Sequence, residues 1–155
     1  MREPNEAYAC IIFSLYAGKS SELTAVMRYL YDSTTFMSEN REAAETIRKI
    51  GMCEMHHLNM LAQLLLKLGT TPKYHACDKG QFTWWNAGAP YMVYPTYLKM
   101  ALLENLDSEK KAIDAYNNAI RAIDDNNITT LLRRIVMDEE HHINLLSEIY
   151  NRCCK

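Results

Sequence analysis

The sequence lacks the features of a nucleic-acid-binding protein and of a membrane protein. Charged residues make up 23% of its 155 residues and the formal net charge is −2, so no basic field is present to attract nucleic acid or anionic lipid. The longest uncharged run, 7–18, is too short to span a bilayer, and the MREPNE before it is too acidic for a signal peptide. We therefore expect a single cytoplasmic domain over residues 1–155, with neither nucleic acid nor a membrane as its partner.

The five cysteines include no C-x-x-C pair of the kind that holds zinc or a rubredoxin iron, or that forms a redox disulfide. Their number is odd, and Cys153 and Cys154 are neighbours. Disulfides are also rare in the cytoplasm. These observations predict that the cysteines are reduced and that most of them have no special chemical role.

Apolar residues recur at helical spacing along nearly the whole chain, and no strand-like alternation competes with that pattern. The pattern predicts an all-α fold with a short helix at about 5–16, which Gly18 either separates from the next helix or kinks. Four long helices should follow: Lys19 to about Met37, Asn40 to Leu68, the residues after Pro95 to Ile123, and Asn126 or Asn127 to the C-terminus. Asn40, and Asn126 or Asn127, are the predicted N-caps.

A long irregular segment, about 70–95, lies between the second and third long helices. A tight hairpin needs only a few residues, so this connection is expected to travel the length of a bundle and to start the third helix at the same end as the second. The result is two antiparallel helical hairpins joined by a crossover. Its aromatic stretch 82–94 is expected to pack as part of the crossover, with a lid or a dimer surface as alternatives. His75 and Cys77 lack further ligands nearby and are not predicted to bind metal.

One short motif occurs twice: CEMHHLNML, which starts at Cys53, returns as DEEHHINLL, which starts at Asp138. Each copy holds an E-x-x-H pair, Glu54 with His57 and Glu139 with His142. Residues three apart leave the same face of a helix, and both pairs continue apolar stripes that a core would bury. A single E-x-x-H carries little weight, because a lone core histidine is more often a packing residue than a ligand. Two pairs in matched frames indicate a shared function.

The other two long helices each carry one matching glutamate, Glu22 and Glu109. Each lies about 30 residues before the E-x-x-H pair of its half, so folding each half as a hairpin brings the glutamate to a similar depth. Four carboxylates and two imidazoles then meet in the middle of the bundle, which is untenable without cations. Two divalent ions would balance the four carboxylates. The sequence thus predicts two transition-metal ions per chain, with the ligands Glu22, Glu54, His57, Glu109, Glu139 and His142.

This ligand pattern resembles that of the ferritin-like carboxylate-bridged dimetal proteins, which include ferritins and bacterioferritins, rubrerythrins and manganese catalases. Phrases such as YAGKSSELTA and DSEKKAI are most similar to the short bacterial proteins near rubrerythrin and manganese catalase. The resemblance implies a ferritin-like four-helix bundle. It also implies that Glu54 and Glu139 bridge or chelate the metals, that His57 and His142 each cap one metal, and that the remaining two glutamates are outer ligands.

Two departures from the rubrerythrin pattern bear on function. A rubrerythrin would be expected to carry a rubredoxin-like domain with two C-x-x-C pairs, and usually another Glu one turn after the ligand of the third helix, where this chain has Ala112. Electron delivery within one chain is therefore not expected. Reactions that need no reductant, such as disproportionation of hydrogen peroxide, are favoured over those that need one.

The oxygen-rich ligand set with one imidazole per metal suits iron or manganese. By resemblance, we expect an oxidoreductase that acts on hydrogen peroxide or dioxygen, either a manganese catalase-like enzyme or a rubrerythrin-like peroxidase. A homo-oligomer is expected, with a separate electron-donor protein if a reductant is needed. Alternatives are ferroxidase activity with iron storage, and a non-catalytic protein stapled by metal, such as a component of a coat. The expected catalytic residues are Glu54, Glu139, Tyr29 and Tyr116.

The tyrosines and the remaining histidines leave alternatives open. Tyr29 and Tyr116 each lie seven residues, or about two turns, after the single glutamate of their helix, and either hydrogen-bond ligand carboxylates or fill the core. His56 and His141 each precede a predicted ligand and are rotated about 100° from it on the helix. We predict that they are partly buried or support the ligands from outside, rather than bind metal themselves.

Overall fold

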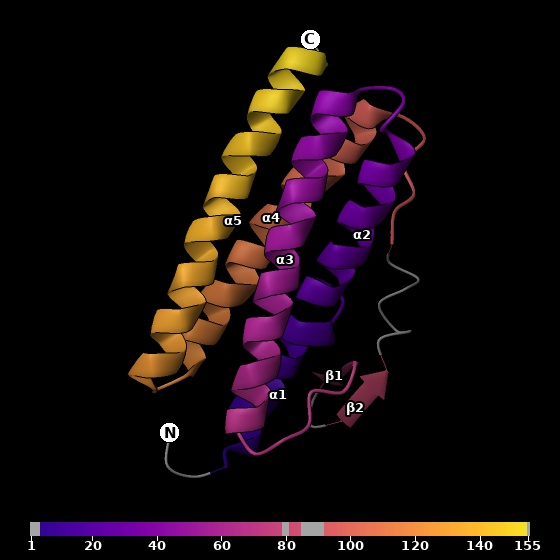
Figure 1. Ribbon diagram of the computed structural model, residues 1–155. Helices are drawn as coiled ribbons and strands as arrows, with labels where there is room; N and C mark the ends of the chain where they lie inside the picture. The colour runs from indigo at the N-terminus through magenta and orange to yellow at the C-terminus, as the bar shows by residue number, and fades with distance from the viewer. Residues whose placement is uncertain (1–3, 79–80, 85–91, 155) are drawn as a thin grey trace.

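The computed structural model describes residues 4–78, 81–84 and 92–154. These residues form five helices and one hairpin: α1 (Glu6–Ala17), α2 (Glu22–Thr35), α3 (Arg41–Lys67), β1 (His75–Asp78), β2 (Gln81–Trp84), α4 (Leu98–Ala122) and α5 (Asn126–Cys153). Helix α2 packs on α3 and α4 packs on α5, and α4 begins at the end of the bundle where α3 begins (Figure 1). The predicted helical bundle of two hairpins joined by a crossover is confirmed. In the described part of the chain, no helix combines the length and apolarity needed to cross a lipid bilayer.

Local sequence explains where the helices begin and end. Asn40 caps α3 as predicted, because its side chain accepts a hydrogen bond from the backbone N–H of Ala43 at 2.9 Å. Helix α5 is capped by Asp125 rather than by either predicted asparagine: its carboxylate accepts from Asn127 N at 2.9 Å and from Ile128 N at 3.1 Å. Aspartate and asparagine are both good N-cap residues, so residue type alone does not show which of positions 125 to 127 caps the helix.

Gly18 separates α1 from α2 rather than kinking one long helix. It ends α1, with its N–H donating to Ser14 O at 3.1 Å. A Cβ at this position would lie 2.3 Å from Ser14 O, so the close turn requires glycine. The next helix starts again at Glu22, with the Ser21 side chain accepting from Thr24 N at 3.3 Å.

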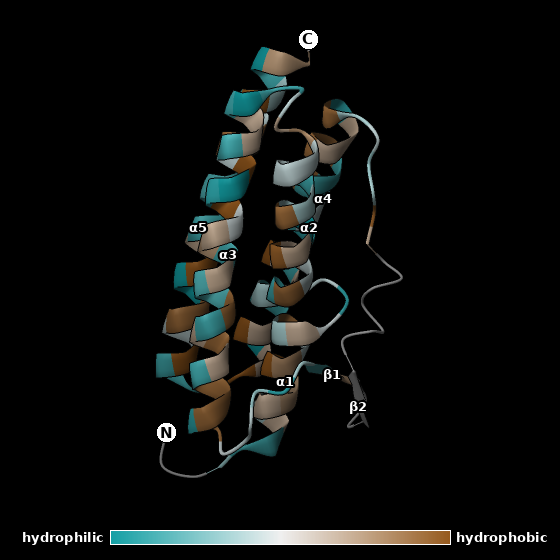
Figure 2. Ribbon diagram, turned by 45° about the vertical axis from the view of Figure 1, so that its right-hand side comes forward, coloured by the Kyte–Doolittle hydropathy of each residue, from teal (hydrophilic) through white to brown (hydrophobic). Residues whose placement is uncertain are grey.

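The core consists of two apolar clusters with a polar layer between them. Along α3, Ile50 belongs to one cluster and Leu61 to the other, and the buried Glu54 and His57 lie between them. The same order is repeated on α5, with Ile135, Glu139, His142 and Leu146. Figure 2 shows hydrophilic and hydrophobic residues alternating along the long helices, as expected of helices that bury one face. The polar layer therefore lies in the middle of the bundle.

The connection between α3 and α4 contains a short antiparallel hairpin that the sequence analysis did not predict. β1 pairs with β2, with His75 opposite Trp84. Strands of four residues are too short to give a clear alternating pattern. Contacts with α1 support them: the His75 ring lies edge-on to Phe13 with centroids 4.6 Å apart, and Ser14 Oγ donates to Cys77 O at 2.9 Å.

The aromatic stretch 82–94 lies mostly outside the residues whose side chains are described. At its described end, Tyr94 packs edge-on against Tyr31 of α2, with ring centroids 5.0 Å apart. This end of the crossover is therefore in contact with the bundle.

Cys10 of α1 and Cys77 of β1 form a disulfide, so the prediction of reduced thiols is wrong for this pair. Their Cα atoms are 5.1 Å apart although the residues are 67 positions apart in the sequence. Local sequence cannot report this contact, because it depends on α1 lying beside the hairpin. Cys53, Cys153 and Cys154 are free. Disulfides are rare in reducing compartments, so this pair removes the cysteine argument for a cytoplasmic location.

Replacing both Cys10 and Cys77 by Ser should lower the free energy of unfolding by about 2–4 kcal/mol, because the cross-link closes a long loop of the unfolded chain. Urea unfolding followed by circular dichroism measures this loss. Cys154→Ser, at a free cysteine, is the matched control and should leave the midpoint unchanged. Adding reductant should move the unfolding midpoint of the wild type to that of the double variant. A wild-type midpoint that does not change with reductant would contradict the cross-link.

Candidate metal centre

The structure brings all six predicted ligands together in the polar layer. Each of the four helices α2 to α5 contributes: Glu22 from α2, Glu54 and His57 from α3, Glu109 from α4, and Glu139 and His142 from α5. Each is at most 4% exposed. Their ligand atoms form two groups of four, each within 4.8 Å, and these groups share Glu54 and Glu139. The arrangement can therefore hold two metal ions with two shared carboxylates.

Each imidazole points Nδ1 at three carboxylates. His57 Nδ1 lies 2.8 Å from Glu54 Oε2 and 3.1 Å from Glu139 Oε1, with Glu22 Oε2 at 3.8 Å. His142 Nδ1 lies 3.1 Å from Glu54 Oε1 and 3.2 Å from Glu139 Oε2, with the oxygen of its own outer glutamate at 3.6 Å. Both shared carboxylates thus present one oxygen to each histidine, as a bridging ligand would.

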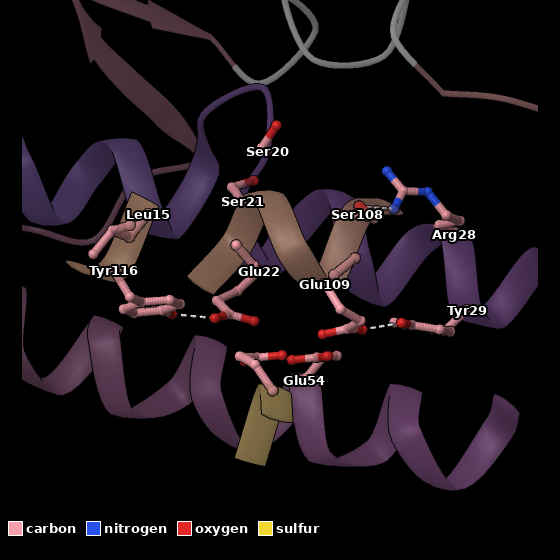
Figure 3. A pocket seen from close by; sticks show the side chains of 13 residues that line it. Leu15, Ser20, Ser21, Glu22, Arg28, Tyr29, Glu54, Ser108, Glu109 and Tyr116 are labelled. Carbon is pink, nitrogen blue, oxygen red and sulfur yellow. Dashed lines mark hydrogen bonds between the residues drawn. The ribbon is translucent and has the colours of Figure 1, made fainter. Parts of the chain in front are cut away.

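The two tyrosines hydrogen-bond ligand carboxylates, and each does so in the opposite half of the bundle. Tyr29 of α2 donates to Glu109 Oε1 of α4, whereas Tyr116 of α4 donates to Glu22 Oε1 of α2 (Figure 3). Both phenols are buried. Of the two alternatives from the sequence, hydrogen bonding is therefore the one observed, across the halves rather than within one helix.

Two of the four carboxylates are the anions of this site. Burial opposes the ionisation of Glu54 and Glu139, but hydrogen bonds outweigh it and hold the pKa of both carboxyls below the ordinary value; the donors are the two histidines for Glu54, and Glu109 and His142 for Glu139. Burial also lowers the pKa of His57 and His142, yet their hydrogen bonds hold it well above the usual range. Two imidazolium ions and two carboxylates therefore balance each other.

The environment of the outer glutamates favours their protonated form. Burial, with repulsion from Glu54, raises the pKa of Glu22 well above its ordinary value. Burial and a hydrogen bond to Glu139 raise the pKa of Glu109 to about 8. The pKa of each tyrosine is also raised, first by burial and then by the carboxylate it contacts, so both phenols remain donors.

One buried oxygen of this layer has no partner among the described residues. Glu139 Oε1 accepts no hydrogen bond although His57 Nδ1 is 3.1 Å away, because the single hydrogen on that nitrogen is directed at Glu54 Oε2. An unsatisfied buried oxygen costs free energy. Glu139 Oε1 faces a group of carboxylate oxygens and imidazole nitrogens, which are atoms that can ligate a metal ion. Carboxylates with one imidazole per group are a donor set that suits iron or manganese.

A small cavity opens onto the site between α2 and α4. Its volume is about 20 Å³, which is room for the centre of about one water-sized molecule. Ala25 and Ala112 line it one turn beyond Glu22 and Glu109. Ala112 thus lies where a further carboxylate would have reached the site.

A side-chain contact lies on the wall of this cavity. Arg28 donates a hydrogen bond to Ser108, and both residues line the cavity (Figure 3). Both residues also line a wider outer pocket of about 100 Å³, together with Ser20 and charged residues of α4. This contact therefore borders both the outer pocket and the cavity beside the carboxylates.

The sequence analysis missed a buried pair beside the site. Asn105 Nδ2 donates to Asp32 Oδ2 at 2.8 Å and links α4 to α2, while Oδ1 of both residues has no partner among the described residues. Burial raises the pKa of Asp32 to about 6, although Asn105 and Arg28 lower it. A protonated Asp32 could donate a hydrogen bond to the amide oxygen of Asn105, so the neutral acid fits this buried pair better than the carboxylate does. The sequence signal for this pair was that Asp32 and Asn105 are polar residues about one helical turn from Tyr29 and Glu109.

A glycine in the middle of α3 was also missed. A Cβ at Gly51 would lie 2.9 Å from the Cβ of Tyr29, so α2 approaches α3 closely at the tyrosine that serves the site. Glycine within a helix costs about 1 kcal/mol relative to alanine. The close approach is the physical reason for it.

His56 and His141 are exposed, so of the two predicted alternatives, partial burial or support of the ligands from outside, the first is wrong. Their rotation away from the neighbouring ligands carries them past the edge of the core to solvent. Neither belongs to a group of described residues that could hold a metal ion. Among the described residues, His75 and Cys77 belong to none either, and Cys77 is part of the disulfide.

Comparisons with known proteins show the family to which the chain belongs. A family model described as Rubrerythrin matches residues 15–150. A probable manganese catalase of Clostridium acetobutylicum is 25% identical over 164 aligned positions, which cover 96% of this chain and 72% of that protein. These matches, with the structural neighbours below, place the chain among the ferritin-like dimetal-carboxylate proteins, as the sequence resemblance predicted.

Solved structures share the fold at low identity. A manganese catalase from Anabaena PCC7120 has a TM-score of 0.88 at 20% identity, over 100% of this chain and 76% of that one. A bacterioferritin from Desulfovibrio desulfuricans has a TM-score of 0.74 at 21% identity, over 93% of this chain and 80% of that one. These likenesses show a common ferritin-like bundle.

Asp32→Asn should stabilise the fold at neutral pH. Burial raises the pKa of Asp32 from its ordinary value of 3.8 to about 6 in the folded chain, so the folded state holds the proton more tightly. The wild type therefore loses stability as pH rises from about 4 through 6, by roughly 2–3 kcal/mol, whereas an asparagine does not ionise. Chemical unfolding at pH 4.5 and pH 7.5 measures the difference. Asp107→Asn, at an exposed carboxylate, is the control; an Asp32→Asn advantage that is equal at both pH values would contradict this.

Proposed function

Because the chain belongs to the rubrerythrin family, we propose that it is a dinuclear iron or manganese oxidoreductase that acts on hydrogen peroxide or dioxygen. The observation that carries the proposal is the pair of four-residue groups that share Glu54 and Glu139 next to a cavity of one-molecule size. Such a site suits a small substrate that must reach two metal ions at once. A homo-oligomeric assembly is part of the proposal.

The six polar-layer residues would hold the metals. One ion would take Glu22, Glu54, His57 and Glu139, and the other Glu54, Glu109, Glu139 and His142. Iron or manganese bound there would supply the redox steps that these side chains cannot perform themselves.

The remaining residues would orient the substrate and hold protons. Tyr29 and Tyr116 keep a proton at the phenol oxygen beside an outer glutamate, and their raised pKa values keep it there at neutral pH. Ala25 and Ala112 leave room for one small molecule, and the Arg28–Ser108 hydrogen bond forms part of the cavity wall. Only a substrate close to the size of water, such as hydrogen peroxide or dioxygen, matches that room.

Manganese catalase-like disproportionation is the reaction we propose first. It converts two hydrogen peroxide molecules into two waters and one dioxygen, so one peroxide is the reductant and the other the oxidant. No C-x-x-C pair occurs in residues 1–155, and this reaction needs no electron donor. A rubrerythrin-like peroxidase with a separate donor protein, or a ferroxidase, is the second candidate. A protein in which the metals only staple the bundle is the third.

The metal content provides the first test of the site. The metal-free chain reconstituted with Mn(II) or Fe(II) in the absence of oxygen should bind two ions per chain, as measured by elemental analysis. His57→Ala should reduce this to about one or fewer, because a buried ligand is lost. His56→Ala, an exposed histidine next to it, is the matched control and should retain two. One ion or none in the wild type would contradict the proposal.

Metal binding should release about four protons per chain at neutral pH. Two come from the cationic His57 and His142, and two from the neutral carboxyls of Glu22 and Glu109. The apparent affinity for metal should therefore rise with pH. Calorimetry in buffers that differ in ionisation enthalpy counts the protons. Release of none would show that the metal-free site is not protonated in this way.

Activity separates the candidate reactions. The manganese-loaded protein should evolve oxygen from hydrogen peroxide without a donor, and His142→Ala should remove most of that evolution while His141→Ala retains it. Oxygen-electrode traces measure this. No evolution, with peroxide consumed by the iron form only when a reductant is added, would favour the peroxidase. Inactivity of both fully loaded forms would favour the stapled structural protein.

A further inference from the structure

The two E-x-x-H motifs differ at a position that contacts the histidines. Cys53 precedes Glu54, and Asp138 precedes Glu139. The motifs are offset by 85 positions throughout, so Cys53 and Asp138 are equivalent residues of the two halves. One half therefore has a thiol where the other has a carboxylate.

Asp138 holds His57 from outside the carboxylate cluster. While Nδ1 of His57 faces the site, Nε2 lies 3.2 Å from Asp138 Oδ2. Arg134 contacts the other oxygen, Oδ1, at 2.6 Å, so Asp138 has a charged partner of its own. A carboxylate that accepts an N–H from a ligating imidazole fixes the ring and its tautomer, and makes the opposite nitrogen a stronger ligand.

Among the described residues, no carboxylate holds His142 in the same way. Its contacts with described carboxylates all run through Nδ1, on the side of the site. The side chain equivalent to Asp138 is the Cys53 thiol, which interacts with both imidazoles and lies 3.6 Å from His57 Nε2. A thiol is a weak hydrogen-bond acceptor, so it orients and polarises a histidine much less than a carboxylate does.

We propose that the Asp138/Cys53 difference makes the two half-sites unequal, so that the first metal ion binds at the His57 half-site and the second at the His142 half-site. This inference rests on the proposed two-metal centre. Outer carboxylates of this kind typically change metal affinity 10- to 100-fold, so the two dissociation constants should differ about tenfold or more. Asp138 is a positioning residue, because it acts on the metal only through His57.

Each half-site has a marker. Glu22 belongs only to the group that contains His57, and Glu109 only to the group that contains His142. A substitution of one of them reports which half-site fills first. Co(II) is a suitable probe, because its visible absorption depends on the ligands around it.

The experiment titrates the metal-free chain with Co(II) in oxygen-free buffer, followed by calorimetry and visible absorption. The wild type should bind two ions in two steps that differ about tenfold or more in dissociation constant. Glu109→Gln should leave the spectrum at one equivalent unchanged, whereas Glu22→Gln should alter it. These measurements need no substitution at Cys53 or Asp138.

Variants of the two equivalent positions then test the cause. Cys53→Asp should tighten the second step until it approaches the first, and Asp138→Asn should weaken the first step about tenfold or more. Combining Cys53→Asp with Asp138→Cys should reverse the order, so that the Glu109 marker now affects the first ion. Cys53→Ser, which adds no carboxylate, is the matched control and should keep the two steps unequal. Circular dichroism confirms that each variant is folded.

Three results would overturn the inference. Two equal affinities in the wild type, or a Cys53→Asp variant with an unchanged ratio, would show that these residues do not set the order of filling. A near-ultraviolet thiolate-to-cobalt band that Cys53→Ser abolishes would make Cys53 a direct ligand. A total of one ion or none would instead contradict the two-metal centre itself, so the two failures are distinguishable.

Discussion

Four carboxyl groups in the dry middle of a helical bundle are the constraint on which the rest of this structure depends. They could not all ionise there without cations, because an unpaired buried charge is strongly disfavoured. The chain balances them from within: two histidines carry positive charge, two tyrosines donate hydrogen bonds, and Glu22 and Glu109 hold protons. Two divalent ions would take over the same balance. The layer is close to neutral when it holds protons and would be close to neutral when it holds metal ions. It could therefore exchange protons for metal ions while the bundle stays folded.

The crossover makes this balance possible. The tyrosine bonds run between the halves, from Tyr29 to Glu109 and from Tyr116 to Glu22, so they require α2 and α4 to lie together at one depth. A short connection after α3 would have started α4 at the wrong end of the bundle. The hairpin in the long connection is tied to α1 by the Cys10–Cys77 disulfide, which fixes one end of the crossover next to the core.

The bundle and the six clustered side chains could be predicted from the sequence because their signals are periodic. Apolar spacing gives the helices, and two E-x-x-H frames on buried stripes give a polar layer at matched depth. The features that could not be predicted depend on contacts between distant segments. The disulfide needs α1 beside β1, and the four-residue strands are too short for a pattern. The exposure of His56 depends on where the edge of the core falls, which spacing alone does not fix.

The site has two sides with different roles, and the helix arrangement separates them. The histidines come from α3 and α5, and the Nε2 atom of His57 faces Asp138 and Cys53. The outer glutamates come from α2 and α4, and the alanine one turn beyond each leaves the cavity open between those helices. Substrate access and histidine orientation thus lie on opposite sides of the shared carboxylates. The open side has room for about one water-sized molecule, which in the proposed enzyme would select substrates by size, while the closed side would set the two metal affinities independently.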